Sequence, residues 1–95
     1  MIEKSKIIAI LKSEGYPEFM HETTYQKISR FNEMIASPFI SWVENEEIPV
    51  ITVEGYSFEF LVSKMNMQPI GAFITLDWLL RDPQKAKNAL ARGIK

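Results

Sequence analysis

The most informative part of the chain for its fold is residues 69–83, which read PIGAFITLDWLLRDP. Proline is favoured in the first turn of a helix, where its missing N–H leaves no bond unmade, so Pro69 predicts a helix start. Asp82 followed by Pro83 is a second start signal, because aspartate caps the free amides of a helix that begins at the proline. The first helix must end just before this cap. We therefore predict a helix over residues 69–81.

Apolar residues occupy two sides of this predicted helix, a broad arc and a stripe at every fourth position. A helix that is apolar on two sides lies either at the centre of a core or in an interface between molecules. Because tryptophan and methionine are enriched in interface centres, we predict that the stripe forms a contact surface with Trp42 and Met67, and core packing is the alternative. Asp77 and Arg81 stand between the two sides, in the order that favours a helical ion pair. The arc contains Ala72, Phe73, Leu76, Leu79 and Leu80, and the stripe contains Ile70, Ile74 and Trp78.

Start and stop signals divide most of the remaining chain into short helices. Gly15 can adopt the left-handed conformation that ends a helix. Thr23 and Gln26 have the spacing of a capping box at a helix start. Ser37 before Pro38 predicts that the chain leaves one helix and begins another there. These signals predict helices over residues 3–14, 24–36, 38–48 and 83–92.

Residues 50–62 carry two conflicting patterns. Val50 to Val53 is rich in β-branched residues, and Glu54-Gly55 is a turn signal that would return the chain as a hairpin. The apolar residues from Val53 to Met65 also follow helical spacing, and methionine and lysine favour helix over strand. We favour a helix that follows an extended run at residues 50–53. The predicted fold is all-α, with five to six short helices in an orthogonal bundle, and the alternative is an α+β fold with one small β-hairpin at residues 50–62.

The composition indicates one compact domain, residues 1–95. A chain of 95 residues with 46% hydrophobic residues can bury one core, whereas two cores would each be marginal. The chain has no cysteine, which suits a reducing compartment, and we expect a cytoplasmic protein. The longest apolar run, Ile70 to Leu80, is well short of the roughly 20 residues that span a bilayer. Ile7 to Leu11 is too short for the core of a signal peptide, so neither secretion nor membrane insertion is expected.

Charge is unevenly distributed along the chain, although the net charge is −1. Residues 31–63 contain six acids and no Lys or Arg, whereas residues 81–95 contain five basic residues and one acid. Such runs are commonly the solvated faces of amphipathic elements. The second interpretation is that the basic tail and the acidic middle attract each other, within one chain or between copies. The acids are Glu33, Glu44, Glu46, Glu47, Glu54 and Glu59.

Residues 57–81 are similar in spacing to a helix-turn-helix motif. Asn66 stands where such turns use a left-handed residue, and residues 69–81 would be the recognition helix. The early positions of that helix carry no Lys or Arg to read base edges or neutralise phosphates, which counts against DNA binding. We keep a DNA-binding regulator as the alternative function. Its contacts would be Gln68 to a base and Lys85, Lys87 and Arg92 to the DNA backbone.

Signals for catalysis are weak. His21 is the only histidine and precedes a predicted helix, where a solvated or capping role is more common than general-base catalysis. The sequence has no nucleophile motif, no glycine-rich phosphate loop and no metal-ligand spacing. We therefore expect no enzyme activity, no cofactor, no metal and no small-molecule substrate. The predicted function is protein–protein interaction or self-association, with a protein partner or a second copy of the chain.

Overall fold

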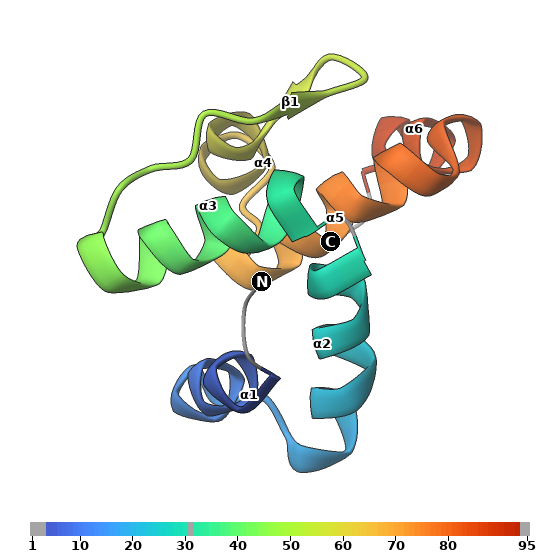
Figure 1. The fold of residues 1–95 in the computed structure, drawn as a ribbon. Coiled ribbons are helices and arrows are strands. Elements are labelled where there is room, and N and C mark those ends of the chain that lie inside the picture. The colour runs from blue at the N-terminus through green and yellow to red at the C-terminus, as the bar shows by residue number, and fades with distance from the viewer. Residues whose placement is uncertain (1–3, 31, 94–95) are drawn as a thin grey trace.

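The structure is a computed structural model that describes residues 4–30 and 32–93, and it is mostly helical. The described residues form six α-helices, one short 3-10 helix and one two-stranded antiparallel hairpin (Figure 1). The predicted all-α class is confirmed, with the small hairpin of the alternative added to it. In chain order the elements are α1 (Lys4–Ser13), η1 (Glu18–Met20), α2 (His21–Arg30), α3 (Asn32–Asn45), β1 (Thr52–Val53), β2 (Tyr56–Ser57), α4 (Phe58–Ser63), α5 (Pro69–Arg81) and α6 (Pro83–Ala91).

Helix α5 is the centre of the fold. It contacts α2, α3, α4, α6 and β1, and Arg81 is the only one of its residues that is exposed. The predicted boundaries are confirmed, because Pro69 occupies the first turn and the Asp82 carboxylate accepts the Lys85 N–H at the start of α6. Asp77 and Arg81 form the predicted ion pair, with Arg81 Nε at 3.0 Å from Asp77 Oδ2. Helix α5 is therefore apolar on two sides because other elements pack around it.

An aromatic cluster joins α3, α4 and α5. Phe73 of α5 lies with its ring centroid at 5.2 Å from that of Phe39 and 4.6 Å from that of Phe58. Trp42 of α3 borders the same cluster, with its centroid at 6.0 Å from that of Phe73. Aromatic contacts at these separations add to the free energy gained by burial alone. The cluster holds the first turn of α4 against the middle of the bundle.

The N-terminal helix packs on α2 at the end of the molecule opposite the hairpin (Figure 1). Gly15 ends α1 with φ of +87°, as predicted, and the Tyr16 N–H bonds back to the Leu11 carbonyl at 3.0 Å. Lys4 and Lys6 reach across to α2 and α3, where they pair with Glu22 and Glu44. The buried side chains of α1 are Ile7, Ile10 and Leu11.

The predicted helix boundaries between residues 23 and 48 are wrong. Helix α2 begins at His21, so Thr23 lies inside it and does not cap it. Helix α3 runs through Pro38, where a new helix was expected, and it ends at Asn45. Ile35 and Phe39 explain this difference, because a continuous helix places both on one face and both are fully buried. Their burial outweighs the backbone hydrogen bond that Pro38 cannot donate.

Residues 50–62 use both of the patterns found in the sequence. Glu54 and Gly55 have φ of +53° and +84°, the two positive values of a tight hairpin turn, and they pair Val53 with Tyr56. Ser57 then caps a helix, because its Oγ accepts the Phe60 N–H at 3.0 Å. The expected helix is thus present only from residue 58, and the hairpin precedes it.

A membrane-crossing helix is absent from the described part of the chain, because its helices are too short or too polar for that role. The longest of them, α3, has 14 residues.

Candidate functional site

The five residues of the predicted contact surface, which are the stripe together with Trp42 and Met67, are all at least partly buried. Ile70 is 2% exposed and belongs to the core. Ile74, Trp78, Trp42 and Met67 are half-buried and pack against that core. None of the five is among the exposed residues, so any contact through them would use only their outer edges.

The helix-turn-helix segment has the predicted local geometry but not an exposed recognition helix. Asn66 adopts the left-handed conformation in the turn between α4 and α5, with φ of +59°. Gln68 is exposed at the start of α5. The rest of α5 up to Leu80 is buried or half-buried, so the helix offers no free face to a DNA groove.

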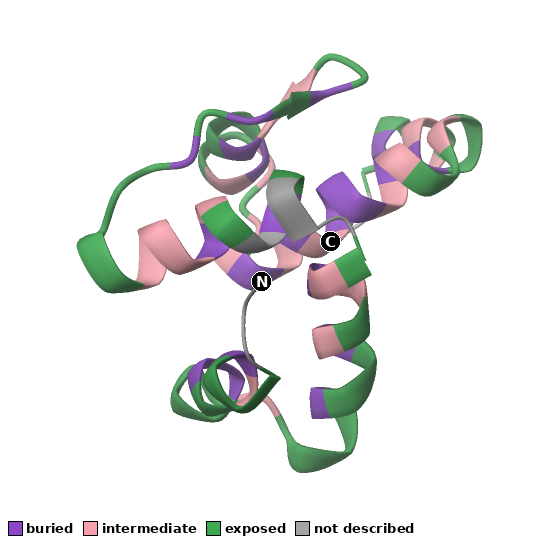
Figure 2. Cartoon of the chain, in the orientation of Figure 1, coloured by how far each residue is buried: buried purple, intermediate pink, exposed green. Residues whose placement is uncertain are grey.

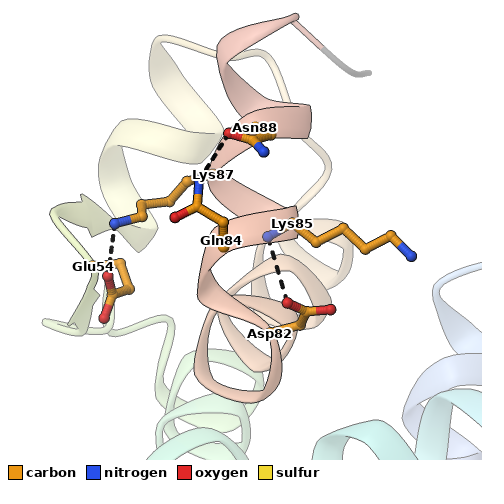
Figure 3. Close-up of polar contacts among 6 residues, drawn as sticks. All are labelled: Glu54, Asp82, Gln84, Lys85, Lys87 and Asn88. Carbon is orange, nitrogen blue, oxygen red and sulfur yellow. Dashed lines mark hydrogen bonds and ion pairs between the residues drawn. The ribbon is translucent and has the colours of Figure 1, made fainter.

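The basic residues of α6 do not converge on one surface. Lys85 and Lys87 point to opposite sides of the helix (Figure 3). Lys87 Nζ lies 3.0 Å from Glu54 Oε1 in the hairpin turn, so the basic tail and the acidic middle do meet within one chain. Gln68 and α6 lie at opposite ends of α5, a separation of roughly 20 Å at the rise of an α-helix. The structure does not bring together the residues of the DNA-binding alternative, which are Gln68, Lys85, Lys87 and Arg92.

His21 is buried and satisfied, which differs from the expected solvated or capping role. It is the first residue of α2, and its Nε2 lies 2.7 Å from the Tyr16 carbonyl oxygen. A carbonyl oxygen only accepts, so Nε2 carries the proton and donates it. Within the described residues, no group of three or more His, Asp or Glu side chains is placed to hold a metal ion.

The first exposed apolar surface lies on η1 and was missed in the sequence. Phe19 is 82% exposed, and Met20 beside it is also exposed. A groove of about 440 Å³ lies next to them, between the turn after α1 and the start of α5. It is lined by Glu14, Gly15, Tyr16, Pro17, Met20, Gln68, Pro69 and Ile70.

The second exposed apolar surface lies on the segment that leads into β1. From Ile48 to Val53 the residues alternate between exposed and buried, which Figure 2 shows as alternating green and purple. Pro49, Ile51 and Val53 face the protein, whereas Val50 is 99% exposed and Ile48 is 62% exposed. This period of two is that of an extended strand with one face on the core. We call residues 48–53 the edge segment.

The edge segment runs along the outside of the molecule from the loop after α3 into strand β1 of the hairpin (Figure 1). A hollow of about 250 Å³ follows it, lined on one side by residues 48–52 and on the other by Ser57 and Glu59. The sequence IPVITV could have indicated this surface, because a strand at the edge of a small protein can bury only one of two apolar faces. Residues 50–53 are predicted as extended, but the sequence does not show which of the two faces is covered by the rest of the protein.

No family model, no curated protein and no solved structure matches this chain in sequence or fold.

Proposed function

We propose that this chain is a non-catalytic protein-binding domain and that the edge segment is its contact surface. The observation that carries the proposal is the position of Val50, which is held fully in solvent by neighbours that are anchored in the core. Burying one such side chain in a partner gains about 1.5–3 kcal/mol. The partner is a second protein or a second copy of this chain. The absence of cysteine is typical of a reducing compartment, and we place the interaction in the cytoplasm.

The edge segment supports this proposal better than the η1 surface does. Phe19 and Met20 are adjacent exposed residues of one short turn, and although a groove lies beside them, their apolar side chains do not repeat along an extended segment. The edge segment instead repeats its apolar residues at strand spacing beside a hollow, so side chains and hollow together can receive an extended ligand. No observation in the described residues favours the DNA-binding alternative over it.

The proposal is tested by photo-crosslinking from the edge segment in the cells that produce the protein. Val50 is replaced by benzoylphenylalanine, and the same replacement of Lys12, exposed on α1, is the matched control. We expect an adduct of defined mass from position 50 that is lost when Ile48→Ser is added, and no such adduct from position 12. Equal yields from both positions, or none from position 50, would contradict the proposal.

Self-association is measured separately by light scattering over a dilution series. A mass that doubles at high concentration and stays low in Val50→Ser would identify the partner as a second copy. A mass that is constant over the series leaves a different protein as the partner.

A further inference from the structure

The side of residues 48–53 that faces away from β2, which we call the outer edge, forms no backbone hydrogen bonds in the described residues. The hairpin pairs Thr52 with Ser57 and Val53 with Tyr56, and the Phe58 N–H donates to the Ile51 carbonyl at 3.0 Å. Val53 and Ile51 therefore direct their backbone groups toward β2.

Alternate residues of a strand direct their N–H and C=O groups to opposite edges. Val50 and Thr52 must then direct theirs away from β2. Apart from the ladder between β1 and β2, no backbone hydrogen bond involves the N–H or C=O of Val50 or Thr52 within residues 4–30 and 32–93. Both residues are exposed, so a second strand can reach these groups. Pro49 does not interrupt this outer edge, because its missing N–H falls on the β2 side of the alternation.

The charge around this edge is negative. Glu46 and Glu47 precede the segment, and Glu59 lies across the hollow on its β2 side; no ion pair to any of the three occurs in the described residues. The surrounding chain, residues 31–63, supplies no Lys or Arg. A ligand strand with basic residues at its ends would be attracted here.

The same acids oppose a second copy as the ligand. Antiparallel pairing of two edge segments would bring Glu46 and Glu47 of one copy alongside the hairpin turn of the other, where Lys87 is already paired with Glu54. Residues 31–63 of the second copy supply no Lys or Arg, so that copy brings no free cation from this segment to Glu46 and Glu47. A basic extended segment of another protein supplies the opposite charge.

We propose that the outer edge of residues 48–53 binds an extended peptide segment of a partner protein by strand addition, and that this segment alternates β-branched residues and carries Lys or Arg at its ends. The inference rests on the proposed function and specifies its ligand. Backbone groups of Val50 and Thr52 supply the hydrogen bonds, Ile48 and Val50 supply the apolar contact, and the glutamates select for positive charge.

The test is a titration of the isotope-labelled full chain with the capped peptide Lys-Val-Thr-Val-Thr-Val-Lys, followed by amide chemical shifts. We expect saturable shifts at residues 48–53, with a dissociation constant of roughly 0.1–1 mM for so short a strand. The peptide Glu-Val-Thr-Val-Thr-Val-Glu is the control and should bind roughly tenfold more weakly at low salt, with a smaller difference at high salt. Equal binding of the two peptides, or no shift at the edge segment, would overturn the proposal.

Two variants of Val50 separate strand addition from plain apolar docking. Val50→Pro removes the outward N–H and keeps an apolar side chain, whereas Val50→Thr keeps the N–H and the shape but adds a hydroxyl. Strand addition predicts that Val50→Pro weakens peptide binding roughly tenfold or more and Val50→Thr by less than that. The reverse order would refute strand addition while leaving a protein-binding role, and unchanged binding in both would refute both. Amide spectra of the free variants show that the fold is retained.

Discussion

Asp77 and Arg81 form one ion pair, but we expect their replacement to change the free energy of unfolding by different amounts. Asp77 is 0% exposed, and its Oδ2 accepts from Arg81 Nε at 3.0 Å. Its other oxygen, Oδ1, is buried without a hydrogen-bond partner in the described residues. Arg81 is 35% exposed, so its guanidinium can turn to water if the pair is lost. Arg81→Met therefore leaves a buried carboxylate uncompensated, whereas Asp77→Leu leaves a cation that solvent can accept.

The magnitudes follow from this difference in burial. Breaking a fully buried pair by removing one partner costs about 3–5 kcal/mol, and the partial exposure of Arg81 reduces this to about 2 kcal/mol. Asp77→Leu removes the unpaired Oδ1, whose burial costs about 1–3 kcal/mol, and adds apolar contact in the centre of α5. We expect Asp77→Leu to change the free energy of unfolding by less than about 1 kcal/mol. Met and Arg have similar helix propensities, so the backbone contributes little to Arg81→Met, whereas Leu is a better helix former than Asp and adds roughly 0.5 kcal/mol in favour of Asp77→Leu.

Urea unfolding followed by tryptophan fluorescence measures these free energies, because Trp42 and Trp78 lie on the two helices that meet near the core. Lys85→Met is the matched control, since Lys85 is an exposed cation on α6 and its replacement should cost less than about 0.5 kcal/mol. If Arg81→Met costs no more than this control, or if Asp77→Leu is the costlier of the two, the reasoning about the buried carboxylate is refuted.

Substitutions at three further positions test local features of the fold. Pro38→Ala should restore a hydrogen bond to the Met34 carbonyl inside α3 and raise the free energy of unfolding by about 1–3 kcal/mol; a decrease in thermal stability would indicate that the proline begins a helix. The hydrogen bond from Lys4 lowers the pKa of Glu22, so their pair stabilises the protein above the usual carboxylate pKa and is lost as pH falls through the lowered value. The stability difference between the unaltered protein and Glu22→Gln in urea should therefore be present at neutral pH and close as the pH falls below the usual carboxylate pKa, and a difference that widens on acidification would contradict this sign. Asn66→Ala should cost about 1 kcal/mol by calorimetry, and Asn66→Gly much less, because the backbone there is left-handed.

Signals that act through a residue's own backbone were sufficient to predict several boundaries. Pro69, the Asp82-Pro83 pair and Gly15 mark helix ends in the structure as they do in the sequence. Each works locally, through a missing N–H, a capping oxygen or freedom to adopt positive φ. Such effects hardly depend on the rest of the fold, and for that reason the sequence is enough to place them.

Pro38 shows where local signals fail. The serine and proline at 37 and 38 have the chemistry of a helix start, and the structure places them inside α3. The outcome depends on whether Ile35 and Phe39 reach one core, which is a property of the three-dimensional packing. Residues 50–62 are a related case, because hairpin and helix signals overlap and the chain changes from one to the other at Ser57.

The position of the contact surface could not be predicted for the same reason, because it depends on the three-dimensional packing of the helices. Periodicity shows that α5 is apolar on two sides, but it does not count the elements that cover those sides, and the structure surrounds α5 with helices. The edge segment likewise has apolar residues on both faces, yet only one of those faces has a neighbour. Val50 is exposed because no other element of the described structure covers the outer face of the edge segment. A sequence pattern does not show how many elements pack against a given face.

An exposed strand edge is a hazard that proteins usually limit with charge, proline or short length. The edge segment is preceded by Glu46 and Glu47, contains Pro49, and has a paired strand of only two residues, so all three features are present. These features oppose pairing between copies, because both copies carry the same acids and the same short edge. They do not oppose a ligand whose charge is opposite, and Pro49 leaves the outward groups of Val50 intact. We therefore expect the features that limit self-pairing also to make the site selective, because the glutamates repel acidic strands and attract basic ones.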